Sequence, residues 1–171
     1  MIYYVRFNMK NTEIVTGIIV NALKVKEFDV RVKILTAEGL KTCTATGALK
    51  PNAKLKSAVQ IFTVAEFSLV GTRIIGAHVF ETNHAITKDI KKYYLACAVC
   101  EVVAQCHGAG FLLTVETIEA LKHTVSLRDT FTKYFSALLL ELGYDIEDDV
   151  DLNTAYMRYL DIKIPNTRYF L

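Results

Sequence analysis

Hydrophobic and polar residues alternate in short runs through the first half of the chain, the pattern of half-buried β-strands. In the run 30–35, VRVKIL, the apolar side chains fall on one face of a strand and Arg31 and Lys33 on the other. Residues that favour turns separate the runs. We therefore predict five strands, at residues 16–25, 30–35, 40–45, 61–69 and 73–81.

Five short strands with this spacing suit an OB-type β-barrel, a fold whose loops and one sheet face bind nucleic acid. Periodicity alone does not separate this barrel from other small barrels. Residues 1–13 precede the first predicted strand, and they either add a strand or form a loose arm.

The period changes to helical in the second half. Residues 89–107 are apolar nearly all round, which predicts a helix inside a bundle that ends at the glycines after His107. Thr114 is predicted to cap a second helix. A third helix runs from about Leu127 to Gly143, and the last begins near Asp151. The predicted fold class is α+β, with a five-stranded OB-fold barrel at residues 1–81 and an all-α helical bundle at 82–171.

Composition supports a packed core, since 52% of the 171 residues are hydrophobic and 22% are charged. No apolar run reaches the roughly 18 residues that a membrane span needs. The N-terminal residues lack a signal-peptide pattern, and the four cysteines are then expected to be reduced. These features predict a cytoplasmic protein.

The net charge of +2 is divided unevenly. Residues 1–80 carry a charge of +6, and residues 81–171 carry −4. A basic first half suggests a polyanion that binds to one side only, although chance could give the same asymmetry.

The connection between the third and fourth predicted strands, residues 46–62, is long and basic. Lys50, Lys54 and Lys56 have no acidic neighbour in this stretch. Long connections are often functional, which favours a loop that binds phosphates. The alternative is a solvated loop without a ligand.

A turn at residues 27–29 could bring four more cations onto one hairpin. Lys24 and Lys26 share a parity before this turn, as Arg31 and Lys33 do after it. Phe28, in the turn, is a weak candidate for base stacking. The full set of candidate DNA-contacting residues is Lys24, Lys26, Arg31, Lys33, Lys50, Lys54, Lys56 and Arg73.

Other chemistry is weakly supported. Cys97 and Cys100, with Cys106 and His107, could form a thiol or metal site, but their positions on an apolar helix favour buried core residues. The acidic residues between 145 and 151 lack the spacing of a calcium loop and favour a helix entry. The histidines show no motif, and we expect no catalytic site, no metal and no cofactor.

Several segments resemble the RecO family of recombination mediators. The basic connection is similar to the family's G-A-[RK]-[RK]-P-x-[SA]-[RK]-L…Q-P-F run, which Lys50 and Lys54 match at basic positions. Further similar segments are Thr16–Val20, Glu27–Asp29 with Leu35-Thr36, Ala137–Tyr144 and Lys163–Leu171. Many members insert a cysteine-bearing, zinc-ribbon-like segment after the Leu-Gly-Tyr helix. This chain has no cysteine there, so the resemblance is to a short member without zinc.

The resemblance implies a non-enzymatic role in recombinational DNA repair, near the nucleoid. Family members bind single- and double-stranded DNA, anneal complementary strands and engage RecR. Many also bind the acidic C-terminal tail of single-stranded DNA-binding protein and help to load the recombinase. The alternative is a protein-interaction module of the repair machinery that has lost DNA binding. A thiol or metal enzyme is a third, weaker alternative.

Overall fold

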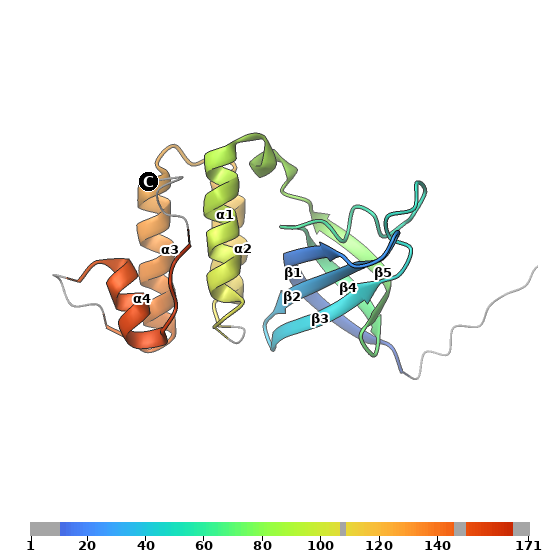
Figure 1. Cartoon of the computed structure of the whole chain (residues 1–171), viewed down its shortest axis with the longest axis horizontal. Coiled ribbons are helices and arrows are strands. Elements are labelled where there is room, and N and C mark those ends of the chain that lie inside the picture. The colour runs from blue at the N-terminus through green and yellow to red at the C-terminus, as the bar shows by residue number, and fades with distance from the viewer. Residues whose placement is uncertain (1–10, 107–108, 146–149, 166–171) are drawn as a thin grey trace, which may run out of the picture.

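A closed barrel of five strands occupies the N-terminal part of the protein (Figure 1). The computed structural model describes residues 11–106, 109–145 and 150–165. The strands are β1 (Glu13–Lys24), β2 (Val30–Thr36), β3 (Gly39–Ala45), β4 (Val64–Val70) and β5 (Arg73–Glu81). All five predicted strands are present, although β4 begins three residues later than predicted, after Phe62, whose φ is 68°.

The barrel has the strand order β1-β2-β3-β5-β4 and the OB topology. All neighbouring strands are antiparallel except β3 and β5, which are parallel and meet at the single pair Thr44 and Arg73. The predicted alternation in β2 is confirmed: Val30, Val32 and Ile34 are buried in the barrel interior. The α+β class with an N-terminal OB-fold barrel is therefore correct.

The connection 46–63 closes one end of the barrel. Its small apolar residues Ala48, Ala58 and Val59 are buried in the interior with the strand residues. Successive turns at 47–56 are held by backbone hydrogen bonds such as Ala53 N–H to Lys50 O. The apolar residues anchor the segment, and its lysines are left in solvent.

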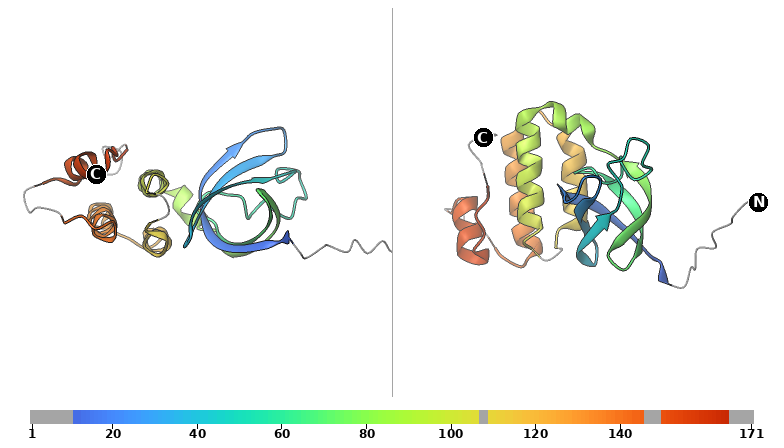
Figure 2. Two further views of the ribbon diagram at one scale, coloured as in Figure 1. Left: turned by 90° about the horizontal axis from the view of Figure 1, so that it is seen from below. Right: turned by 45° about the vertical axis from the view of Figure 1, so that its right-hand side comes forward.

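Four α-helices follow the barrel and stand on one side of it (Figures 1 and 2). They are preceded by a short 3-10 helix, η2 (His84–Lys88), and are α1 (Ile90–Val103), α2 (Phe111–Leu121), α3 (Leu127–Glu141) and α4 (Leu152–Leu160). Asp89, Ser126 and Asp151 cap α1, α3 and α4 through their side chains. The predicted starts of the third and fourth helices are therefore confirmed.

Two predicted helix ends are wrong. The first helix ends at Val103, before His107, and a turn follows at 104–106. The second begins at Phe111 after Gly110, whose φ is 78°, so Thr114 is inside the helix. Glu141 of α3 accepts the Gly110 N–H at 2.7 Å and caps α2 in place of a local side chain. Thr114 is buried, and its hydroxyl is 3.0 Å from the Tyr134 hydroxyl.

One hydrophobic core joins the barrel wall to the helices. Ile18, Val20 and Leu35 lie on the outer face of β1 and β2, and they are buried against α1 and its neighbours. Phe62 belongs to the same core, with its ring centroid 5.9 Å from that of Tyr93. Since α1 packs against the barrel and the other helices at once, it is apolar nearly all round. The division into domains at residue 81 stays a prediction.

Within the described parts of the chain, no helix has the length and apolar character that crossing a bilayer requires. The possible strand at the extreme N-terminus falls on residues 1–10, outside the described residues, and β1 begins at Glu13.

Candidate nucleic-acid interface

Two predicted arginines lie in one row across the outer face of the barrel. The strand register pairs Arg31 of β2 with Thr44 of β3, and Thr44 with Arg73 of β5. Neighbouring strands are about 4.8 Å apart, so the two arginine backbones are roughly 10 Å apart on either side of Thr44. Both arginines are exposed. We call Arg31, Thr44 and Arg73 the arginine row. Both arginines were predicted from the sequence, but no local signal indicates that the parallel β3–β5 pair brings them together.

The β1–β2 hairpin carries its four cations on different faces. The register places Leu23 opposite Arg31, Asn21 opposite Lys33 and Lys24 opposite Val30. Paired residues share a face, and Val30 points into the barrel interior, so Lys24 has the opposite parity from Arg31 and Lys33. Lys24 is exposed because β1 extends past the end of the core. The expected hairpin is formed, but it does not present four cations as one face.

The two basic loops lie side by side. The backbone N–H of Leu49 donates to the Phe28 carbonyl at 3.0 Å, and the Gly47 N–H donates to the Asp29 carboxylate at 2.7 Å. These bonds join residues 25–29 to the start of the connection 46–63, and Figure 1 shows both loops at the same side of the barrel. Lys26 and Lys50 are exposed on these adjacent loops. Phe28 is half-buried, and its role in stacking stays a prediction.

Lys54 and Lys56 lie further along the connection, on either side of the partly buried Leu55. Both lysines are exposed. Among the described residues, none of the eight predicted cations forms an ion pair. These exposed charges are therefore available to an anionic partner.

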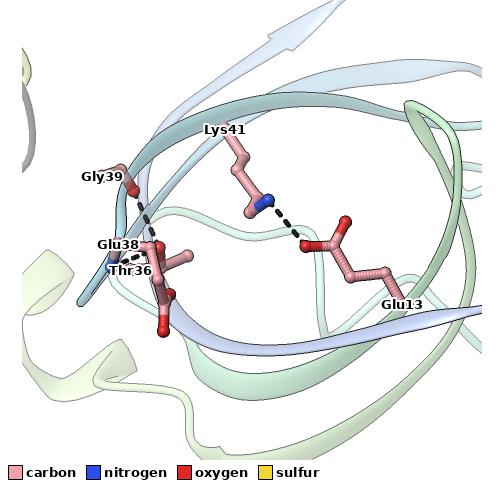
Figure 3. Close-up of polar contacts among 5 residues, drawn as sticks. All are labelled: Glu13, Thr36, Glu38, Gly39 and Lys41. Carbon is pink, nitrogen blue, oxygen red and sulfur yellow. Dashed lines mark hydrogen bonds and ion pairs between the residues drawn. The ribbon is translucent and has the colours of Figure 1, made fainter.

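Lys41 shows the contrasting case. Its ammonium group lies 2.7 Å from the Glu13 carboxylate and joins β3 to β1, two strands that are not hydrogen-bonded to each other (Figure 3). The hydrogen bond to Glu13 raises the pKa of Lys41. Figure 3 also shows Thr36, whose hydroxyl donates to the Gly39 carbonyl and accepts the Glu38 N–H in the β2–β3 turn. Lys41 thus has an internal partner that the eight candidates lack.

The helices cover part of the outer sheet face. Ile18, Val20 and Leu35 of this face are buried, whereas Arg31 and Lys33 remain exposed. Lys33 lines a groove between the barrel and α1 that also includes Glu101 and Gln105. Along β2, the exposed Arg31 and Lys33 therefore lie nearer the loop at residues 25–29 than the covered Leu35 does.

The cysteines are core residues. Cys43, Cys100 and Cys106 are buried, and Cys97 is half-buried. Burial raises the pKa of each thiol, to about 11 for Cys106, so the thiols are protonated at neutral pH. No group of three or more His, Cys, Asp or Glu side chains in the described ranges is arranged to hold a metal ion. His107 lies outside those ranges.

In the acidic stretch 145–151, Asp151 is the N-cap of α4, as expected for a helix entry. The Asp151 carboxylate accepts hydrogen bonds from the Thr154 N–H and hydroxyl, which lower its pKa. Asp145 is exposed, and residues 146–149 are outside the described residues.

A closed barrel of OB topology that carries exposed cations is a fold that many nucleic-acid-binding proteins share. Residues 9–77 match the family described as Recombination protein O N terminal. The match confirms the resemblance to RecO over the barrel, residues 9–77. No curated protein gives a significant match to the chain. The description of this family associates its members with recombination.

Proposed function

We propose that this protein binds DNA through the arginine row and the two basic loops, and that it acts without catalysis in recombinational repair at the nucleoid. The observation that carries the proposal is the register that sets Arg31 and Arg73 on either side of Thr44, next to the loops with Lys26 and Lys50. Cations at this spacing on a rigid sheet can contact successive phosphates of one strand.

The cationic side of the barrel can also account for annealing. Neutralising the phosphates of two complementary strands reduces their repulsion and lets them pair on one surface. By the family resemblance, the partners are RecR and the acidic C-terminal tail of single-stranded DNA-binding protein, and the outcome is help in loading the recombinase. The eight cations named from the sequence remain the proposed DNA contacts.

Salt dependence of DNA binding tests this proposal. Replacing Lys50, Lys54 and Lys56 with Ala removes three exposed charges from a segment whose buried anchors are left intact. The logarithmic salt slope for single-stranded DNA should fall by about 0.7 for each phosphate that the variant no longer neutralises. A matched control replaces Lys88, Lys133 and Lys163, three exposed lysines of the helical half, and should leave the slope unchanged. An unchanged slope in the loop variant would remove the loop from the site.

A second candidate is an interaction module that has lost DNA binding. It is favoured by exposed apolar side chains on β1, β4 and β5, where Ile14, Val70 and Phe80 are 63%, 44% and 54% exposed. Exposed apolar side chains suit a protein partner where they form a continuous patch. Retained binding of RecR or the acidic tail, without DNA binding at low salt, would support this candidate.

A further inference from the structure

A groove separates the outer face of β1 and β2 from helix α1. Its volume is about 610 Å³, within the range of small-molecule sites. The barrel wall includes Asn21 and Lys33, and the helix wall includes Tyr93, Glu101 and Gln105. None of these positions was singled out as a ligand site from the sequence except Lys33, which was named as a phosphate contact.

The groove walls carry side chains that can still donate or accept hydrogen bonds. Neither Lys33 nor Glu101 forms an ion pair within the described residues. The Gln105 side-chain amide donates to the Glu101 carbonyl at 3.1 Å, which leaves the Gln105 carbonyl oxygen as an acceptor. The Glu101 carboxylate and the Gln105 oxygen together make the helix wall rich in acceptors.

Tyr93 gives the groove a fixed aromatic surface. Its ring centroid lies 5.9 Å from that of Phe62 and 6.2 Å from that of Tyr94. A hydrogen bond with Cys97 is the main cause that raises the pKa of Tyr93. A partly exposed aromatic side chain that packs against two neighbouring rings is a suitable contact for a planar ligand.

The groove is continuous with the proposed DNA path. Lys33 follows Arg31 by two residues on β2, so both point to the same outer face. A strand whose phosphates contact Arg31 and then Lys33 passes the mouth of the groove. On the helix wall of the groove, Glu101 would repel a phosphate or a peptide carboxylate, so this wall suits a neutral group that donates hydrogen bonds.

We propose that the groove binds one unstacked base of single-stranded DNA, and that it prefers bases with an exocyclic amino group. The N4 amino group of cytosine donates hydrogen bonds, and glutamate is its usual acceptor in protein–DNA contacts. Thymine has no amino group to meet Glu101. A duplex cannot enter the groove, because its bases are paired and stacked. This inference rests on DNA binding by the barrel.

The test compares 5′-labelled oligo-dC and oligo-dT of equal length by fluorescence anisotropy at pH 7.5 and one salt concentration. The wild-type protein should bind oligo-dC about fivefold to tenfold more tightly, the lower end of what a base-specific contact provides. The Glu101→Ala variant should bind the two oligonucleotides equally. Glu119→Ala removes an equal charge from an exposed position on α2 and should keep the preference.

The outcomes separate this inference from the proposed function. Equal binding of oligo-dC and oligo-dT by the wild-type protein, or a preference that survives Glu101→Ala, would overturn the base site while DNA binding stands. An absence of binding to any oligonucleotide at low salt would overturn both proposals. Duplex affinity gives a further check, because Glu101→Ala and Glu119→Ala should change it to the same extent.

Discussion

The Asn83 side-chain amide donates a hydrogen bond to the Phe62 carbonyl at 2.9 Å, and both residues have a positive φ, 51° and 68°. Asn83 follows the last barrel strand, and Phe62 lies one residue before the end of the long connection that closes the barrel. Both side chains are buried, at 2% and 0% exposure. The Phe62 ring packs on Tyr93 of α1, so this bond lies where the barrel meets the helices.

Replacing Asn83 with Ala should lower the free energy of unfolding by about 1–3 kcal/mol. The change leaves the buried Phe62 carbonyl without its partner, and it puts a residue less tolerant of positive φ at this position. Urea denaturation followed by circular dichroism measures the effect. Asn52→Ala, at an exposed loop position, is the control and should be nearly neutral. Equal midpoints for the two variants would contradict a structural role for this bond.

Gly17 should tolerate no side chain. An added Cβ would lie 2.6 Å from the Leu35 carbonyl oxygen and 2.5 Å from the Ile34 Cγ2. Gly17→Ala therefore forces β1 and β2 apart, and we expect a loss of about 1–3 kcal/mol or more, as for overpacked cores.

Gly76→Ala provides the matched control for Gly17→Ala. Gly76 is also a strand glycine of the barrel, but its added Cβ would meet only Ser68 at 3.7 Å, an ordinary contact distance. Thermal unfolding should show a large drop in Tm for Gly17→Ala and little change for Gly76→Ala. Similar Tm values would mean that the strands separate at little cost.

Arg31 and Arg73 should act as a pair in DNA binding. Each single substitution by Ala should weaken binding to single-stranded DNA and reduce the salt slope by about 0.7, the value for one phosphate contact. The double variant should reduce the slope by about twice that amount. Lys41→Ala is a useful comparison, because Lys41 is already paired with Glu13 at 2.7 Å. A Lys41 variant that lowers the slope as much as Arg31→Ala would contradict the assignment of the row.

Glu81 should contribute a small stability increment that depends on pH. Its carboxylate accepts the backbone N–H groups of Asn83 and Thr82 and lies 3.4 Å from the Lys122 ammonium group. The hydrogen bond from Asn83 is the main cause that lowers the pKa of Glu81. The increment is therefore present above the ordinary glutamate pKa of about 4.3, and it is lost as the pH falls through the lower pKa of the folded state.

The Glu81→Gln variant isolates this increment. It should be less stable than wild type at pH 7, by no more than about 1 kcal/mol since the group is exposed. The difference should shrink as the pH falls below about 4. A stability difference that stays constant from pH 7 to pH 3 would contradict ionisation as its source.

Local patterns predicted the barrel well because its strands are half-buried. Six residues are enough to show the alternation in β2, with Arg31 and Lys33 between the apolar positions. The structure confirms that the apolar residues are buried and the two cations exposed. The helix starts predicted near Leu127 and Asp151 also depend on local contacts, since Ser126 and Asp151 each accept a backbone N–H three residues later.

Features that depend on distant partners were not predictable. Glu141 caps α2 from another helix, so the local candidate Thr114 was chosen wrongly. The arginine row depends on the β3–β5 register, and the groove depends on α1 packing against β1 and β2. The sequence does not predict that the connection 46–63 is anchored in the barrel core, because the buried residues Ala48 and Ala58 are too small to form a hydrophobic pattern.

DNA binding by the barrel is tested most directly by the anisotropy of a labelled single-stranded oligonucleotide with the whole protein over a series of salt concentrations. We predict tight binding at low salt that weakens steeply toward physiological salt, because the unpaired cations of the barrel displace counterions from DNA. Absence of binding at low salt would contradict DNA binding by the barrel and leave the interaction module as the function.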